Sequence, residues 1–216
     1  NLPQDLLDEF KCPVVETIPA EIAPKESPPS PPLGLLSQAY NHNLAQAFLM
    51  GNWDEESAGD VEVVTKLATE EYDKWIPPLR EALEIPGAPV ALSNREWATK
   101  RNLKTWEQLG KKLYDDDLDR FEKVAARALS ESDPAFDLPG DERYMANIKG
   151  KIPRYSHRIR EGIADALAVM GSCPHLFPHC ADNKSETVAL LVVRQVLTDV
   201  DWRTWGSLNN HLPLLA

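Results

Sequence analysis

Residues 90–99 read Val90-Ala91-Leu92-Ser93-Asn94-Arg95-Glu96-Trp97-Ala98-Thr99. Two short runs with apolar residues flank the polar turn Ser93-Asn94-Arg95, and this pattern predicts a β-hairpin. The rest of the chain beyond residue 33 carries apolar residues at helical spacing. The sequence therefore predicts a mainly α protein with one small β unit.

Three helices are predicted before the hairpin. The first ends at Gly51, the second begins at Asp60, and the third is capped by Thr69. We expect Pro77 and Pro78 to kink the third helix, because each lacks an amide donor. Three helices followed by a hairpin is the order of elements in a winged helix, which we place at residues 34–101. The inner faces should carry Leu36, Tyr40, Leu44, Ala47, Phe48, Val63, Val64, Leu67, Trp75, Leu79, Ala82 and Leu83.

Residues 102–216 are predicted to form a second, helical domain. No repeat of fixed period is present, so we expect an irregular bundle or array rather than a regular solenoid. Its helices are expected at 105–113, from Asp115 or Asp116 to Leu129, at 141–148, from Ser156 to Gly171, from Ser185 to Val196, and from Trp202 onward.

The two ends of the chain suggest a piece of a longer polypeptide. Residues 13–32 hold seven of the eighteen prolines, so residues 1–33 are predicted to be an extended linker, with Pro28 and Pro31 leaving a PxxP ligand as the alternative. The chain lacks an initiator Met and stops one turn after Pro213 opens an apolar helix. We expect a truncation there, and a natural C-terminus with a short tail is the alternative.

Composition excludes several classes of protein. Of the 216 residues 43% are hydrophobic and 26% charged, which is ordinary for a globular chain. The net charge of −11 argues against a general binder of nucleic acid or anionic membranes. No apolar run approaches the ~20 residues of a membrane span, and no leader opens the chain. We expect a soluble cytoplasmic protein whose three cysteines stay reduced.

One loop offers candidate metal ligands, namely Cys173, His175, His179 and Cys180. Structural zinc takes four such groups in a tetrahedron. However, all four lie within eight residues, and the neighbours His179 and Cys180 would seldom converge on one ion. The sequence favours an ordinary inter-helix loop without a cofactor, and it leaves structural zinc open.

Catalytic motifs are absent from the sequence. It contains no phosphate loop, GxGxxG, nucleophile elbow or HExxH pair. The run Asp115-Asp116-Asp117 is typical of a helix start, where carboxylates complement the dipole. We therefore expect no catalytic residues and no enzymatic activity in this segment.

Charge is segregated along the chain. The third helix carries acidic residues that phosphates would repel, so it should not read DNA. Two stretches are basic, one around the hairpin and one at a loop that leads into a helix, where the helix dipole favours anions. The second stretch favours a solvated surface or one paired within the chain, and it leaves contact with a nucleotide phosphate, a nucleic acid or an acidic face of the same chain open. The acidic residues are Glu70, Glu71, Asp73, Glu81 and Glu84. The basic residues are Arg95, Lys100, Arg101, Lys104, Lys111 and Lys112, and then Lys149, Lys151, Arg154, Arg158 and Arg160.

Several stretches are similar to large bacterial signal-transducing ATPases of the STAND type, in the region that follows their nucleotide-binding core. They are residues 47–54 (Ala-Phe-Leu-Met-Gly-Asn-Trp-Asp), 116–121 (Asp-Asp-Leu-Asp-Arg-Phe), 202–208 (Trp-Arg-Thr-Trp-Gly-Ser-Leu) and 212–216 (Leu-Pro-Leu-Leu-Ala). The resemblance implies a winged helix that packs on the ATPase core and helices that relay its nucleotide state or present a partner surface. No ATP-binding residue can be carried over to this chain.

The expected function is therefore a non-catalytic interaction segment of a larger bacterial protein, and the resemblance implies that this larger protein is an ATPase. Its partners would be other domains of the same chain or another protein, with neither nucleic acid nor membrane. Two alternatives stay open, a DNA-binding winged-helix regulator that uses the wing and residues 149–160, and an enzyme of unrecognised type.

Overall fold

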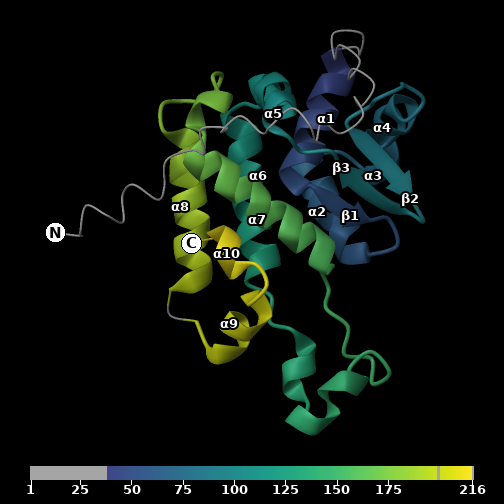
Figure 1. Ribbon diagram of the computed structural model, residues 1–216, viewed down its shortest axis with the longest axis vertical. Helices are drawn as coiled ribbons and strands as arrows, with labels where there is room; N and C mark the ends of the chain where they lie inside the picture. The colour runs from purple at the N-terminus through teal and green to yellow at the C-terminus, as the bar shows by residue number, and fades with distance from the viewer. Residues whose placement is uncertain (1–37, 199, 216) are drawn as a thin grey trace, which may run out of the picture.

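The computed structural model describes residues 38–198 and 200–215, so the predicted linker at residues 1–33 and Leu36 lie outside the described residues. The fold is mainly α, as predicted, with one small antiparallel sheet (Figure 1). Among the helices of the described residues, none combines the length and apolar character that crossing a bilayer requires.

The helices are interrupted at two places by strands of the sheet, first by a single short strand and then by the hairpin. The first part comprises α1 (Gln38–Met50), β1 (Asn52–Asp54), α2 (Ala58–Ala68), α3 (Tyr72–Trp75), α4 (Pro77–Ala82), β2 (Val90–Ser93) and β3 (Glu96–Thr99). The second part comprises α5 (Leu103–Leu109), α6 (Asp115–Leu129), α7 (His157–Ser172), α8 (Lys184–Leu197), α9 (Trp202–Leu208) and α10 (Leu212–Leu215). Short 3-10 helices lie at Gly110–Lys112, Pro134–Asp137, Gly140–Met145 and Pro174–Leu176.

The predicted hairpin is confirmed, and the sheet contains one more strand than expected. β2 and β3 pair antiparallel around a tight turn in which Asn94 and Arg95 both have positive φ, at 50° and 65°. β1 adds to the other edge of β3, which gives the strand order β1-β3-β2. Trp53 lies opposite Trp97, and the two indoles stack 5.4 Å apart. A strand of three residues is too short to show alternation, so the sequence did not reveal β1.

The prolines break the third predicted helix completely. α3 ends at Trp75 and α4 begins at Pro77, where a missing amide costs nothing in the first turn. Thr69 was predicted as the cap of this helix, and that is wrong. It ends α2 instead, in a left-handed conformation with φ 57°, whereas an N-cap needs extended backbone.

Helix starts elsewhere differ from the prediction by a few residues. Ser156 caps α7 as predicted, through its hydroxyl and the amide of Ile159. The residues that precede the other helices are Ser57 for α2, Asn102 for α5, Tyr114 for α6 and Asn183 for α8. Near a helix end several polar residues compete for the cap, so spacing alone does not select one.

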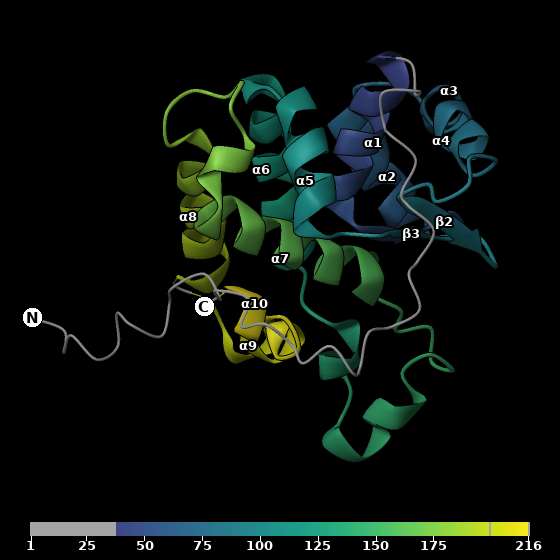
Figure 2. The same cartoon turned by 45° about the horizontal axis from the view of Figure 1, so that its top comes forward.

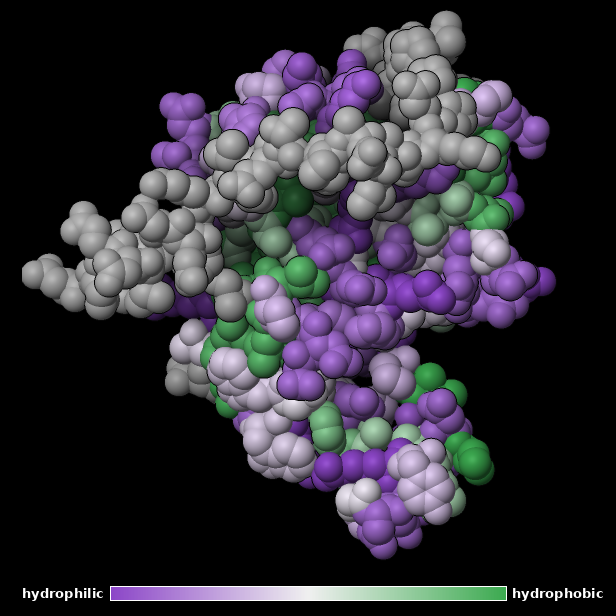
Figure 3. All heavy atoms as spheres, in the orientation of Figure 1, coloured by the Kyte–Doolittle hydropathy of each residue, from purple (hydrophilic) through white to green (hydrophobic). Residues whose placement is uncertain are grey.

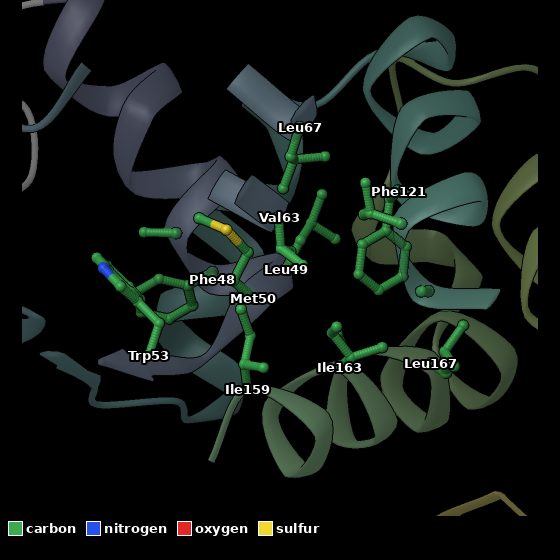
Figure 4. Close-up of a cluster of buried hydrophobic side chains, with 14 of the residues drawn as sticks. Phe48, Leu49, Met50, Trp53, Val63, Leu67, Phe121, Ile159, Ile163 and Leu167 are labelled. Atoms are coloured by element: carbon green, nitrogen blue, oxygen red, sulfur yellow. The ribbon is translucent and has the colours of Figure 1, made fainter. Parts of the chain in front are cut away.

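One hydrophobic core runs through both predicted domains. Helix α7 lies at its centre, in contact with α1, β1, α8 and α10. Figure 4 shows Ile159, Ile163 and Leu167 of α7 pointing toward side chains of α1, α2 and α6. The backbones of α7 and α1 approach closely at Gly162, where a Cβ atom would lie 2.1 Å from the carbonyl oxygen of Met50. The sheet unit and the helical array are thus packed against one another directly.

A lobe formed by residues 131–154 projects from the helical body (Figures 1 and 2). Ala146 is its only buried residue, and it does not belong to the main core. Helix α9 lies beside the lobe, with Trp202 against Phe136 at a centroid distance of 5.4 Å. The lobe is therefore held by α9, by the pairing of Arg154 with Glu62 of α2 and by its two connections to the body.

Candidate functional site

The surface formed by α3, α4 and the residues that flank them is acidic, as the sequence predicts. The residues Glu70, Glu71, Asp73, Glu81 and Glu84 are all exposed, and we call them the acidic face. The inner side is fixed by Trp75, whose indole N–H donates to Gln46 of α1 at 2.9 Å and whose carbonyl accepts from Asn43 at 2.9 Å. This anchoring on α1 turns the acidic side chains outward.

An open depression lies next to the acidic face. Its lining consists of Glu55, Glu56, Val61, Glu71, Tyr72, Asp73, Arg80 and Arg95. Glu55 accepts hydrogen bonds there from Arg80 at 2.7 Å, from the Trp97 indole at 2.6 Å and from the Tyr72 hydroxyl at 3.1 Å. Burial, together with the charge of Glu55, raises the pKa of Tyr72, so its phenol stays a donor. The polar groups of the depression therefore bond to one another, and through Glu55 they connect the end of β1 with α3, α4 and β3.

The four residues predicted to contact an anion each have a carboxylate of the same chain as a partner. Arg158 pairs with Glu96 at 2.9 Å and Lys151 with Asp137 at 2.9 Å. Arg154 pairs with Glu62, and Lys149 with Glu142. These pairs are half-exposed, so each contributes little stability, yet each lowers the charge that a phosphate would meet.

The carboxylate of Asp60 occupies the N-terminus of α7. Asp60 is fully buried, and it accepts from the Ser156 amide at 2.8 Å and from the Ser156 hydroxyl at 2.6 Å. It also accepts from the amide of Asp54 at 3.0 Å. Of the three anions considered for the loop before α7, the structure brings an acidic group of the same chain to this position.

Two of the basic residues around the hairpin also form ion pairs within the chain. Arg95 pairs with Glu56. Arg101 reaches α7, where it donates to the Gly162 carbonyl at 2.7 Å and pairs with Asp165 at 2.9 Å. These contacts fix β3 and the following segment to neighbouring elements.

The structure does not gather the four candidate zinc ligands into a site. His179 Nδ1 lies 2.6 Å from the carbonyl oxygen of Lys111, and Cys180 donates its S–H to the Leu113 carbonyl at 3.6 Å. Burial raises the pKa of the Cys180 thiol to about 11, which disfavours the thiolate that zinc requires. His175 is exposed and Cys173 is half-buried. Within residues 38–198 and 200–215, no three His, Cys, Asp or Glu side chains are arranged to hold a metal ion.

Asp117 is the centre of a buried network that the sequence did not reveal. Its carboxylate lies 3.1 Å from His42 Nε2, and it accepts from Gln46 at 3.2 Å and from Arg120 at 2.6 Å. It also accepts from the Tyr114 amide at 3.1 Å, in the capping role that the sequence predicts for this acidic run. His42 makes no hydrogen bond to a nucleophilic side chain within the described part of the chain. The network therefore ties α1 to α6 and offers no acid–base dyad with a nucleophile.

Exposed apolar side chains form the other notable surface. Tyr144, Ile148 and Ile152 of the lobe are 83%, 86% and 66% exposed. Trp202 and Trp205 of α9 are 57% and 42% exposed. Figure 3 shows apolar spheres on the lobe, below the polar middle of the molecule. Helical spacing did not predict this surface, since the lobe has 3-10 and irregular backbone.

Comparison with protein-family models, with curated proteins and with solved structures finds no match to this chain.

Proposed function

We propose that this chain is a non-catalytic interaction module of a larger bacterial protein, which relays or presents signals beside an upstream ATPase core. The observation that carries the proposal is the charge arrangement. The acidic face points outward, with Glu71 paired to Lys74 at 2.7 Å, whereas all four basic residues predicted to meet a polyanion are paired with carboxylates of the same chain. This surface suits a partner protein with basic side chains and repels phosphates.

The topology supports a winged-helix assignment for the first part of the module. The element order α1-β1-α2-α3-α4-β2-β3 and the strand order β1-β3-β2 agree with a three-helix unit that carries a wing. In winged helices that read DNA, the third helix enters the major groove. Here that position belongs to α3 and α4, which carry the acidic face. We infer that this helix pair docks on protein.

The shared core supports a relay. Helix α7 contacts α1 and β1 on one side and α8 and α10 on the other, so a displacement of the sheet unit would act directly on the helical array. The exposed aromatic residues of the lobe and α9 offer a second surface, at the opposite end of the array, where a partner can be presented.

The decisive experiment uses the parent chain. Its translated gene should contain a phosphate loop upstream of Asn1, and the charge-reversed variant Glu71→Lys/Asp73→Lys should change its ATPase rate several-fold. The matched control is Glu107→Lys, which reverses an exposed acid on α5. A parent without a nucleotide-binding domain, or equal effects of the two variants, would refute the proposal.

A DNA-binding regulator is the second candidate, because the element order agrees with winged helices that bind duplexes. It predicts salt-dependent retardation of duplex DNA that weakens in Arg154→Glu/Arg158→Glu. Our proposal predicts no retardation at about 150 mM salt, since the phosphates would have to displace carboxylates from these arginines.

A further inference from the structure

The turn before α10 places a buried histidine against two basic side chains. His211 is 1% exposed, and its ring centroid lies 4.8 Å from that of His157 at the start of α7. Its Nδ1 atom is buried without a hydrogen-bond partner within the described residues. The imidazole is therefore packed as a neutral group on the surface of α7.

Arg160, one turn further along α7, makes this environment cationic. It is 5% exposed, its guanidinium Nε has no partner within the described residues, and its Nη2 donates to the Leu129 carbonyl at 3.4 Å. Burial lowers the pKa of Arg160, whereas the carboxylates of Glu131 and Asp133, in the segment after α6, favour its positive charge. Asp201 at the start of α9 accepts hydrogen bonds from the amides of Arg203 and Thr204. The charged groups that act on His211 itself are thus Arg160 and His157.

Helix α9 contacts the lobe independently of α10. The Ser207 hydroxyl accepts from the Asp133 amide at 2.6 Å, and Trp202 packs on Phe136. Helix α10, by contrast, lies on α7 with Leu215 buried (Figure 2). Residues 209–215 can consequently separate from α7 without taking α9 from the lobe.

From this geometry we propose that His211 is an acid-sensitive latch, whose protonation releases residues 209–215 from α7 while the remaining core stays folded. The inference does not depend on the function proposed above. In this buried site Arg160 would repel a protonated His211, and no carboxylate of the described residues pairs with its ring, so the charged ring is more stable in water.

The titration of His211 gives the size of the effect. Burial, followed by the charges of Arg160 and His157, lowers its pKa from 6.5 to about 4. Because the released state binds the proton more readily, release is favoured as the pH falls below 6.5. Between about pH 7.5 and about pH 5 the release equilibrium should shift about 30-fold.

Hydrogen exchange with mass spectrometry on the whole chain tests the latch, after correction for the intrinsic pH dependence of exchange. Peptides that cover residues 209–215 should lose about 30-fold in protection between about pH 7.5 and about pH 5, while α6 peptides keep theirs. Loss of protection everywhere, or no loss in residues 209–215, would overturn the proposal.

Variants identify the titrating group. His211→Gln cannot be protonated and should remove the pH dependence. His157→Gln, at an exposed position, should reduce it by removing one of the two basic side chains that lower the pKa of His211. The control His175→Gln alters an exposed histidine of another loop and should behave as the wild type. A pH-dependent loss that persists in His211→Gln would assign the effect to a different group and refute the latch.

Discussion

The carboxylate of Asp60 accepts hydrogen bonds from both the amide and the hydroxyl of Ser156, although the two residues are 96 positions apart. Through the Asp54 amide the same carboxylate also reaches β1. One buried side chain thereby joins the sheet, the start of α2 and the start of α7.

Replacing Asp60 should be costly. Asp60→Ala leaves three donors without their acceptor in a buried position, and we expect it to lower the free energy of unfolding by about 2–4 kcal/mol. Ser156→Ala removes the hydroxyl alone and should cost about 1 kcal/mol. Urea denaturation measures both, and equal losses would mean that the carboxylate is not the centre of this junction.

Two glycines of α7 provide a matched pair. Gly162→Ala puts a Cβ atom 2.1 Å from the Met50 carbonyl oxygen, so two backbones must separate. We expect a loss of about 3 kcal/mol or more, or no soluble protein at all. Gly171→Ala meets only the Ala189 methyl group at 3.7 Å, and it should stabilise α7 by up to about 1 kcal/mol. Thermal unfolding of the two variants should therefore shift in opposite directions.

Asp117 should contribute a stability that depends on pH. Burial disfavours its charge, but the hydrogen bonds from His42, the Tyr114 amide and Gln46 prevail and lower its pKa below 3.8. Its contribution is thus fully present above the ordinary value and is lost as the pH falls through the lower native one. We expect Asp117→Asn to lose about 2–3 kcal/mol at neutral pH and to unfold less steeply in acid.

The exposed neighbour provides the control for this change. Asp116→Asn should stay within about 0.5 kcal/mol of the wild type in the same acid titration, since surface substitutions of this kind have small effects. If the two variants respond alike, the network around Asp117 does not determine the acid sensitivity.

Cys180 should react slowly with alkylating reagents. Burial, reinforced by Asp115 and Asp117, raises its pKa from 9 to about 11, so at about pH 8 its thiolate is about 100-fold scarcer than that of an unperturbed thiol. Peptide mapping after iodoacetamide treatment should show modification of Cys180 in urea and almost none in the native protein. Rapid native labelling would contradict the hydrogen bond to Leu113.

Much of the architecture follows from local sequence patterns. The hairpin around Asn94 and the helix that begins after Ser156 depend on residues close together in the chain, so spacing and turn chemistry predict them. The same chemistry predicts a kink at Pro77, where the structure has a complete break. β1 is held by pairing with β3, more than forty residues away, and its own three residues carry no periodic signal. The contact of α7 with α1 escapes prediction for the same reason.

The sequence predicts where the charged residues of the candidate site lie, but it does not predict which of them form ion pairs. The exposed acids of α3 and α4 follow from composition and helical spacing. Whether Arg154 meets a phosphate or Glu62 depends on where α2 lies relative to the loop before α7, which is a property of the tertiary fold. The exposure of Ile148 and Ile152 is equally non-local, because the lobe lacks a neighbouring layer that would cover them.

The lobe has a consequence for how this chain can be cut and rejoined. Since residues 131–154 add no side chain to the main core, proteolytic nicking near Gly150 would sever the polypeptide without removing a packed layer. The two resulting fragments would bear α6 on one side and α7 with α8 on the other, and these helices pack on one another. The protein is accordingly suited to fragment complementation, with two halves that reassemble by themselves.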